Sequence, residues 1–303
     1  MMQDFKGKTA VLTGAGSGFG LECARIGAAR GMNLVLVDVQ QDALDKAKAK
    51  AEMEAAGVQV LARKVDVSDA AQMEALAAAV KERFGAPHFV FNNAGVGAGG
   101  LVWENSVSDW EWVLGVDLWG VIHGVRLFTP MMLEAAAKDP GYRGHITNTA
   151  SMAGLLPPPN MDIYNAAKAA VVSLTETLYQ DLNLVTDQIG ASLLCPYFVP
   201  TGITSSERNR PNAPKDSELT KSQLIGQAMS NKAVSSGKIS AAEVAAMVFG
   251  AISDNQFYVF SHPKALGNVR ARMENIVSVT NPADPFFERP EIGQKLREQL
   301  RSA

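Results

Sequence analysis

The feature that most constrains the fold is an alternation between short runs rich in Val, Ile and Leu and longer segments with helical periodicity. The short runs are Thr9–Thr13, Asn33–Val37, Gln59–Leu61, His88–Phe91, His145–Asn148, Ala191–Leu194 and Phe257–Phe260. The helical segments are Leu21–Arg30, Gln41–Ala56, Ala70–Phe84, Asp109–Ala137, Ile163–Thr186 and Ala241–Ser253. Parallel strands need crossover helices, and these cover both faces of a sheet. The alternation therefore predicts an α/β fold: a doubly wound parallel sheet of the Rossmann type, with seven strands in one domain over residues 1–262.

Two regions depart from this alternation. Residues 201–238 are rich in Ser, Asn, Lys and Pro and have weak apolar periodicity. We interpret them as a lid over a ligand site, although a plain surface loop would have a similar composition. Residues 263–303 form a C-terminal extension with one amphipathic helix, Leu266–Val277, and a proline-rich stretch that ends in Phe286 and Phe287. Because disorder would leave these phenylalanines exposed, we expect the extension to pack on the domain or on a partner subunit.

Charge and cysteine content exclude several classes of protein. The chain has 28 Lys and Arg residues against 31 Asp and Glu residues, which argues against a nucleic-acid partner. No apolar run reaches the length of about 18 residues that a membrane helix needs, and the N-terminus is too polar for a signal peptide. Cys23 and Cys195 lie far apart, and the four histidines have no ligand-like spacing, so we expect no metal site. A cytoplasmic location fits these features.

A glycine-rich loop directly follows the first expected strand. Its glycines are Gly14, Gly18 and Gly20, with Ser17 and Phe19 between them, and a helix follows at once. Glycines allow a sharp turn and close approach to a pyrophosphate, whose charge then lies at the helix N-terminus. The spacing is GxxxGxG rather than GxGxxG, so the loop alone leaves open a merely structural turn.

An acidic residue supports a dinucleotide site. Asp38 ends the second expected strand, about 20 residues after the glycines, where a carboxylate accepts hydrogen bonds from the ribose hydroxyls. The same carboxylate would repel a 2′-phosphate, and the next residue, Val39, carries no positive charge. The sequence thus favours NAD, with NADP less favoured.

Three polar residues form a candidate catalytic group. Tyr164 and Lys168 are four residues apart on an expected helix, so that they lie on one face. Alone, such a pair is often a solvated surface pair. Ser151, however, follows an expected strand at the same sheet edge as the glycine loop, where ligands of doubly wound folds bind.

At this point the chain resembles the short-chain dehydrogenase/reductase family over most of residues 5–262. The matching motifs are TGxxxGxG at Thr13–Gly20, Asp38, Asp66-Val67, Asn92-Asn93-Ala94-Gly95, Ser151 and Tyr164-x3-Lys168. The resemblance implies that Asp66 and Val67 flank the adenine, that Asn93 lines the cofactor cleft, and that Val199 and Thr201 lie at the nicotinamide carboxamide. It also implies a homodimer or homotetramer.

The sequence departs from the family pattern at two positions. The family usually has Asn where this chain has Asp117, a catalytic position in its proton relay, and Gly where this chain has Tyr197 after Pro196. A relay through the backbone carbonyl of residue 117 would survive the first change.

The expected chemistry is hydride transfer. A phenol with a pKa of about 10 is a poor base at neutral pH, and a nearby ammonium stabilises the phenolate. We therefore expect Lys168 to lower the pKa of Tyr164, which acts as general base in oxidation and general acid in reduction. Ser151 would orient the substrate oxygen.

The substrate prediction rests on apolar residues. Residues 155–161, between Ser151 and Tyr164, read as an apolar wall, and Tyr197 and Phe198 follow the sixth expected strand. We predict an oxidoreductase that uses NAD(H) and an apolar secondary alcohol or ketone. Two alternatives stay open: an epimerase or lyase that retains NAD, and a non-catalytic dinucleotide-binding scaffold.

Overall fold

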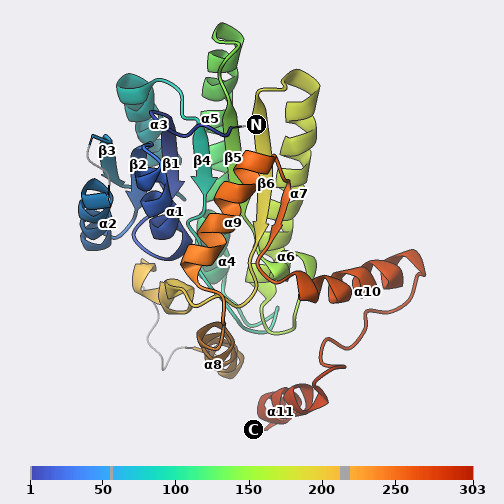
Figure 1. The fold of residues 1–303 in the computed structure, drawn as a ribbon. Coiled ribbons are helices and arrows are strands. Elements are labelled where there is room, and N and C mark those ends of the chain that lie inside the picture. Colours follow the sequence, from blue (N-terminus) through green and yellow to red (C-terminus); the bar gives the residue numbers. More distant parts are fainter. Residues whose placement is uncertain (1, 55–56, 212–218, 303) are drawn as a thin grey trace.

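The protein is described by a computed structural model that covers residues 2–54, 57–211 and 219–302. Seven strands form one parallel sheet in the order β3-β2-β1-β4-β5-β6-β7 (Figure 1). They are β1 (Thr9–Thr13), β2 (Asn33–Asp38), β3 (Val60–Lys64), β4 (Phe89–Asn92), β5 (Gly144–Thr149), β6 (Ile189–Cys195) and β7 (Tyr258–Phe260). The predicted doubly wound sheet is confirmed. The strand order reverses between β1 and β4, which is where such folds bind ligands.

Helices cover both faces of the sheet. On one face lie α1 (Gly18–Ala29), α2 (Gln41–Glu54) and α9 (Ala241–Asp254). On the other face lie α3 (Ala70–Phe84), α5 (Gly120–Lys138) and α7 (Asp162–Val185). The apolar sides of these helices and the strands form two buried clusters, one on each face. The end of the helix expected over residues 41–56 lies outside the described residues.

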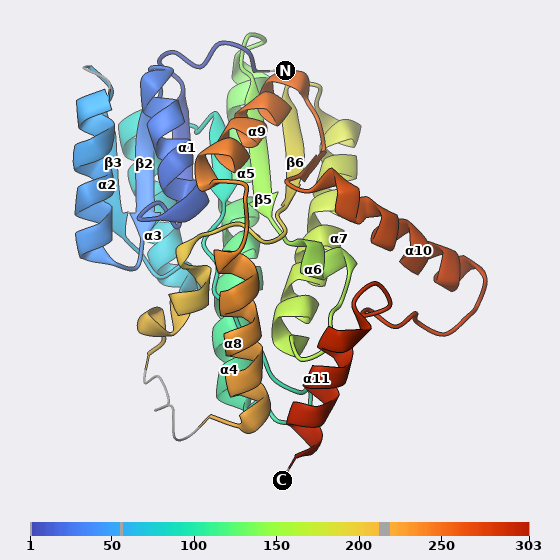
Figure 2. The ribbon, with the colours of Figure 1, turned by 60° about the horizontal axis from the view of Figure 1, so that its bottom comes forward.

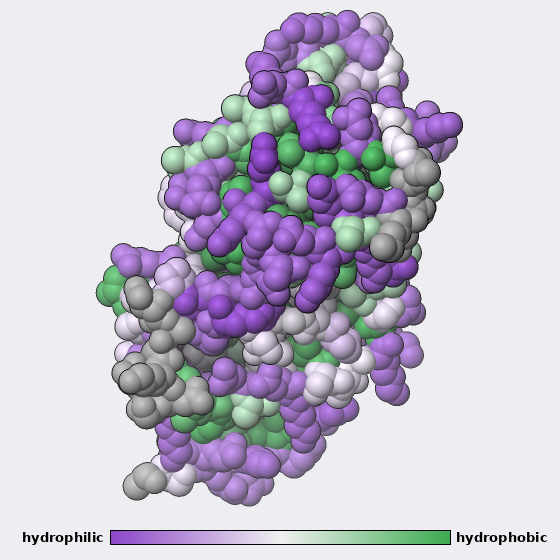
Figure 3. Space-filling model, turned by 90° about the vertical axis from the view of Figure 1, so that its left-hand side faces the viewer, coloured by the Kyte–Doolittle hydropathy of each residue, from purple (hydrophilic) through white to green (hydrophobic). Residues whose placement is uncertain are grey.

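Strand β3 is longer than the run Gln59–Leu61 that the sequence indicated. Its last residues, Arg63 and Lys64, are exposed at the edge of the sheet. Charged side chains on an edge strand discourage pairing with another sheet, and they also hide the strand from an apolar-pattern search. The molecular face on this side is largely hydrophilic, with apolar side chains in separate groups (Figure 3).

The single helix expected over residues 109–137 is wrong. The structure has α4 (Val107–Leu114), a π-helical turn η1 (Gly115–Trp119) and then α5. Glycines flank the π-helical turn on both sides. A Cβ on Gly115 would lie 3.2 Å from Ser68 Cβ, and one on Gly120 would lie 2.7 Å from Val67 Cγ2. Periodicity cannot reveal one extra residue per turn, and such turns are frequent at functional sites.

The lid, residues 201–238, contains more regular structure than its composition indicated. It forms a 3₁₀ segment, η2 (Gly202–Asn209), and a helix, α8 (Lys221–Ser235), while residues 212–218 lie outside the described residues. Helix α8 begins with a capping box in which Thr220 and Gln223 exchange hydrogen bonds. The signal for this helix was thus its N-terminal cap rather than its periodicity.

The tail, residues 263–303, contains the expected helix α10 (Leu266–Val277) and a further helix, α11 (Pro290–Arg301). Helix α10 has no buried residue and extends away from the sheet. Helix α11 turns back toward α8, and Lys221 Nζ donates a hydrogen bond of 2.9 Å to Ser302 Oγ (Figure 2). In the described part of the chain, no helix combines the length and apolarity needed to span a bilayer.

Candidate active site

The glycine loop between β1 and α1 leaves no room for side chains. Gly14 and Gly18 have φ values of +66° and +54°, in the left-handed region. A Cβ on Gly14 would lie 3.0 Å from Ala94 Cα, and one on Gly20 would lie 2.2 Å from the carbonyl oxygen of Gly14. The loop therefore packs against its own backbone and against the segment after β4, and larger residues would change its path.

The N-terminus of α1 keeps its backbone donors free of side-chain caps. Ser17 makes no capping hydrogen bond, and the first turn of α1 has no acidic residue. Opposite the loop, Thr201 Cγ2 would lie 3.4 Å from a Cβ on Gly18. Ser17, Gly18, Phe19 and Thr201 line one cavity. These donors and the helix dipole are suited to a pyrophosphate, so the residues present fit a dinucleotide.

The carboxylate of Asp38 is fixed at the end of β2. Its Oδ2 accepts a hydrogen bond of 2.8 Å from the N–H of Gly16, and its Oδ1 accepts one of 3.0 Å from the N–H of Gln40. Asp66 and Val67 follow β3 on the same side and also line the cavity. This arrangement places acidic and apolar groups where the resemblance puts the adenosine.

Asn93 connects three strand ends. Its N–H donates to Thr13 Oγ1 at 2.8 Å, its side-chain amide donates to the Thr13 carbonyl at 3.0 Å, and its Oδ1 accepts from Thr149 Oγ1 at 3.3 Å. Asn93 thus lines the cavity and also joins β1, β4 and β5 at their carboxyl ends.

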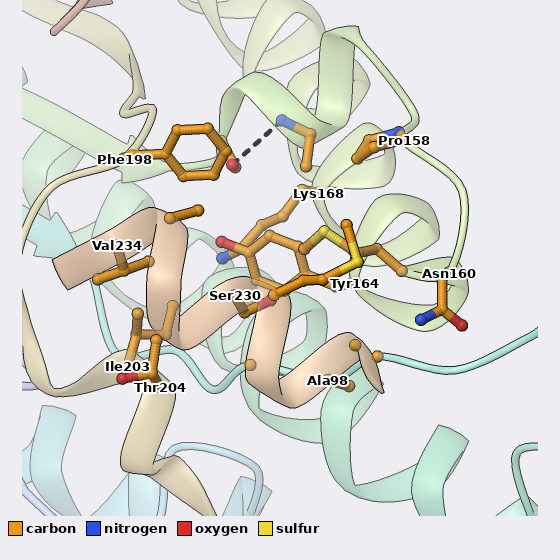
Figure 4. Close-up of a pocket in the computed structure, with 18 of the residues that line it drawn as sticks. Ala98, Pro158, Asn160, Tyr164, Lys168, Phe198, Ile203, Thr204, Ser230 and Val234 are labelled. Carbon is orange, nitrogen blue, oxygen red and sulfur yellow. Dashed lines mark hydrogen bonds between the residues drawn. The ribbon is translucent and has the colours of Figure 1, made fainter. Parts of the chain in front are cut away.

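Ser151, Tyr164 and Lys168 line the same cavity. Figure 4 shows Tyr164 and Lys168 side by side. Ser151 caps the short helix α6 (Met152–Leu155), and its Oγ accepts a hydrogen bond of 3.1 Å from the N–H of Ala153. The Ser151 side chain also lies near enough to Tyr164 to lower the pKa of its phenol. Lys168 Nζ lies 5.6 Å from the Tyr164 ring centroid and donates to the Thr149 carbonyl at 3.1 Å. Helix α7 supplies both residues on one face, as the four-residue spacing predicts.

Asp117 lies behind this group rather than in the cavity. From the π-helical turn it forms a fully buried ion pair, with Asp117 Oδ2 3.2 Å from Lys168 Nζ. Its Oδ1 accepts a hydrogen bond of 2.7 Å from the N–H of Val96. Asp117 therefore positions the ammonium through its side chain, a contact that the sequence did not predict.

The net pKa of Tyr164 differs from the sequence-based expectation. Burial raises the pKa of the phenol, Lys168 opposes this, and the Asp117 carboxylate raises it further, with a net increase. For Lys168, burial alone would lower the pKa of the ammonium, but Asp117 and Tyr164 outweigh burial and raise it. Lys168 does act in the expected direction on Tyr164. Burial, which was not visible in the sequence, opposes this effect and raises the pKa of the phenol.

One continuous cavity of about 2520 Å³ contains most of the expected site residues. It is larger than the 300–1,000 Å³ or so of an ordinary ligand pocket, which leaves room for a dinucleotide and a second molecule. The expected residues that line it are Gly14, Ser17, Gly18, Phe19, Asp38, Asp66, Val67, Asn93, Ser151, Tyr164, Lys168, Val199 and Thr201. Gly20 does not line it, since it packs under the loop.

The cavity continues from Tyr164 between α8 and the tail. Pro158, Asn160, Phe198, Ile203 and Val234 surround this part in Figure 4. The expected wall begins one residue later than predicted, because Leu155 packs with a separate apolar cluster behind α6. The rings of Tyr197 and Phe198 are in contact, with their centroids 4.1 Å apart and their planes tilted by 30°.

Sequence reasoning missed the residues of the lid that reach the site. Buried Ser206 accepts a hydrogen bond of 2.9 Å from the N–H of Gly97, and Arg208 Nε donates to Gln40 Oε1 at 3.4 Å. A single Ser or Arg in a polar segment gives no sequence signal for contacts 109 and 168 residues away. Of the clustered tryptophans, Trp112 lines the cavity, whereas Trp103 and Trp119 are exposed.

Within residues 2–54, 57–211 and 219–302, no group of three or more His, Cys, Asp or Glu side chains is arranged to hold a metal ion.

Comparison with known proteins gives consistent results. The family described as short chain dehydrogenase matches residues 8–212. The CLA biosynthesis dehydrogenase/reductase of Lactiplantibacillus plantarum is 33% identical over 281 residues, 91% of this chain and 96% of the relative. Meso-2,3-butanediol dehydrogenase of Serratia marcescens is 36% identical over 201 residues, 66% of this chain and 75% of the relative. A short-chain dehydrogenase/reductase from Burkholderia phymatum, solved in complex with NAD, is 52% identical, with a TM-score of 0.88 over 94% of this chain and 99% of that one.

Proposed function

Because the chain belongs to the short-chain dehydrogenase/reductase family, we propose that it interconverts an apolar secondary alcohol and its ketone with NAD(H). The family makes it an NAD(P)-dependent oxidoreductase. The substrate, the cofactor preference and the residue roles are the content of the proposal.

The observation that carries the proposal is the meeting of Ser151, Tyr164 and Lys168 in a cavity that is continuous with the glycine loop. A hydroxyl, a phenol and an ammonium at one point can bind a substrate oxygen and exchange its proton. The uncapped N-terminus of α1 can hold the phosphates of a dinucleotide in the same cavity.

The three side chains would divide the work as follows. Tyr164 accepts the hydroxyl proton in oxidation and returns it in reduction. Lys168 stabilises the phenolate, and Ser151 donates a hydrogen bond to the substrate oxygen, because its Oγ already accepts from Ala153. A bound nicotinamide would supply the hydride acceptor or donor, and its oxidised form would add positive charge that favours the phenolate. Without that charge the raised pKa of Tyr164 suits it to acid catalysis.

Asp117 would act as a positioning residue. It holds the Lys168 ammonium charged and in place, since its carboxylate and the Thr149 carbonyl both contact Nζ. The proton relay that the family resemblance implies would use the backbone carbonyl of residue 117.

We propose NAD as the favoured cofactor because the Asp38 carboxylate is fixed where a ribose diol would bind. The NAD-bound relative from B. phymatum supports this choice. If Asp38 excludes a 2′-phosphate, kcat/KM should favour NAD over NADP, and the double variant Asp38→Ser, Val39→Arg should narrow or reverse the preference. Preference of the unmodified enzyme for NADP would contradict the assignment.

An apolar substrate is supported by the walls of the cavity beyond Tyr164, where Pro158, Phe198, Ile203 and Val234 gather. The relatives range from a CLA biosynthesis dehydrogenase/reductase to a dehydrogenase of a small diol. The proposal of an apolar substrate therefore rests on the residues that line the cavity of this chain. We also propose a cytoplasmic homodimer or homotetramer as the working form.

A steady-state assay tests the proposed function. Purified protein is mixed with NAD or NADP and a panel of secondary alcohols, or with NADH or NADPH and the matching ketones. Turnover of bulky apolar members is the expected result. Tightly retained NAD without net turnover of cofactor would favour an epimerase or lyase, and cofactor binding without any turnover would favour a scaffold.

A further inference from the structure

Arg208 occupies an unexpected place. The lid carries it on η2, and its guanidinium reaches the opposite side of the cavity, at Gln40, two residues after Asp38. The sequence offered no cation for this part of the site, since Val39 follows Asp38.

The guanidinium is held by the backbone of its own segment. Arg208 Nη1 donates to the carbonyl oxygens of Gly202, at 3.0 Å, and of Ser205. Its Nε donates to Gln40 Oε1 at 3.4 Å. These contacts hold the exposed guanidinium in a position where it lines the cavity.

The second terminal nitrogen faces the glycine loop. A Cβ on Gly202 would lie 3.3 Å from Arg208 Nη2 and 3.8 Å from Ser17 Oγ, so both groups lie beside Gly202. Ser17 is the uncapped first residue at the N-terminus of α1. Arg208 and the positive end of α1 thus approach the same part of the cavity.

No carboxylate in the described ranges 2–54, 57–211 and 219–302 forms an ion pair with Arg208. The nearby Asp38 already accepts hydrogen bonds from two backbone N–H groups. By contrast, Arg210, two residues along, is paired with Asp109 at 2.7 Å. The chain therefore neutralises one arginine of the lid and leaves the other facing a cavity lined by backbone donors.

We infer that Arg208 binds a phosphate group of the dinucleotide and thereby ties the lid to the bound cofactor. The inference rests on the proposed function and adds a cofactor ligand from the lid. A guanidinium matches a phosphate with two parallel hydrogen bonds, and phosphates are the anionic groups of NAD and NADP. The pyrophosphate and the 2′-phosphate are the two sources, since Arg208 lies between Ser17 and Gln40.

This contact gives cofactor binding a second effect. Gly202 precedes the lid residues Ile203 and Thr204, which line the substrate side of the cavity in Figure 4. A phosphate that fixes Arg208 also fixes the segment that carries these walls.

The test uses the purified full-length protein and binding measurements rather than turnover. The variants are Arg208→Gln and Arg208→Lys, with Arg270→Gln as a matched control, because Arg270 is exposed on α10 and does not line the cavity. Calorimetry gives Kd for NADH, NADPH, ADP-ribose, 2′,5′-ADP and adenosine. Thermal melting shows that each variant is folded, and the lysine variant keeps a charge at the site.

Loss of the guanidinium should weaken the binding of NADH, NADPH and ADP-ribose about ten- to hundredfold and leave the binding of adenosine unchanged. Arg208→Lys should recover part of the lost affinity. That pattern identifies the pyrophosphate. Weakening confined to NADPH and 2′,5′-ADP supports the inference with the 2′-phosphate as the partner. Affinities within about twofold of the wild type and the Arg270 control for every ligand overturn it. Failure of the wild type to bind either dinucleotide would instead contradict the proposed function.

Discussion

The base of the cavity and its lid are held by different kinds of contact. At the base, Asp117 and Lys168 are almost fully buried, and their charges are satisfied by each other and by backbone groups of two strand ends. The lid is held mainly by side-chain contacts, among them the ion pair between Arg210 and Asp109 and the buried hydroxyls of Ser206 and Ser222, each of which accepts one backbone N–H from the loop after β4.

This difference separates two tasks. The buried charges at the ends of the strands cannot rearrange without a large loss of electrostatic energy. Such a fixed arrangement is suited to proton transfer. A segment attached by side-chain contacts at the surface can adopt a second position at lower cost than the base can, which suits substrate entry and selection. Changes at the base should therefore act on kcat and on pH dependence, and changes in the lid should act on KM and on specificity.

The largest expected effect is at Tyr164. Tyr164→Phe keeps the ring and removes the proton carrier, so kcat should fall about 10²- to 10⁴-fold while the Kd for NADH stays within a few-fold of the wild type. Tyr179→Phe is the matched control, because it removes the same atom from the same helix outside the cavity. Retention of more than about a tenth of wild-type kcat in Tyr164→Phe would remove Tyr164 from the chemistry.

The next largest effect concerns the apolar part of the cavity, which is lined by the lid and by residues 156–161. A ketone or alcohol with four additional buried carbons should react with kcat/KM about two orders of magnitude higher, since each buried methylene contributes about 0.8 kcal/mol. The measurement is kcat/KM across an alkyl and aryl series, with a polyol as reference. Comparable values for a polyol and a bulky aryl alcohol would contradict the apolar cavity.

Asp117→Asn tests the electrostatics of the base. Asp117 raises the pKa of Tyr164, so removing its charge should lower that pKa and move the acidic limb of the kcat/KM profile for oxidation to lower pH. Below the limb, oxidation should become severalfold faster while Lys168 remains charged. An unchanged profile would show that Asp117 does not act on Tyr164, and an equal loss of kcat at every pH would assign the carboxylate a direct part in the relay.

The smallest expected effect is at the attachment of the lid. Ser222→Ala removes the acceptor for the Leu101 N–H and should reduce the free energy of unfolding by about 1 kcal/mol, as measured in urea. KM for substrate should rise a few-fold with little change in kcat. Ser235→Ala is a suitable control, because Ser235 is exposed on the same helix and does not line the cavity. A fall in kcat alone would contradict the separation between base and lid.

Much of the site could be predicted because its signals are local. The glycine loop, Asp38 at a strand end and the pair Tyr164 and Lys168 each depend on a few neighbouring residues and on their place at one sheet edge. The same local signals missed α8 and α11, whose apolar periodicity is weak, and the π-helical turn, which adds one residue to an otherwise regular helix.

By itself the sequence determined the parallel sheet, the alternation of its strands with crossover helices, and most of the residues that gather at its carboxyl edge, because side-chain period and turn chemistry act over short distances. Only the tertiary structure decided the ion pair between Asp117 and Lys168, the net rise in the pKa of Tyr164 and the approach of Arg208 to Gln40. These depend on burial and on contacts between distant parts of the chain. Burial determines the free-energy cost of ionising a group. Neither burial nor long-range contacts can be read from the local pattern of residues.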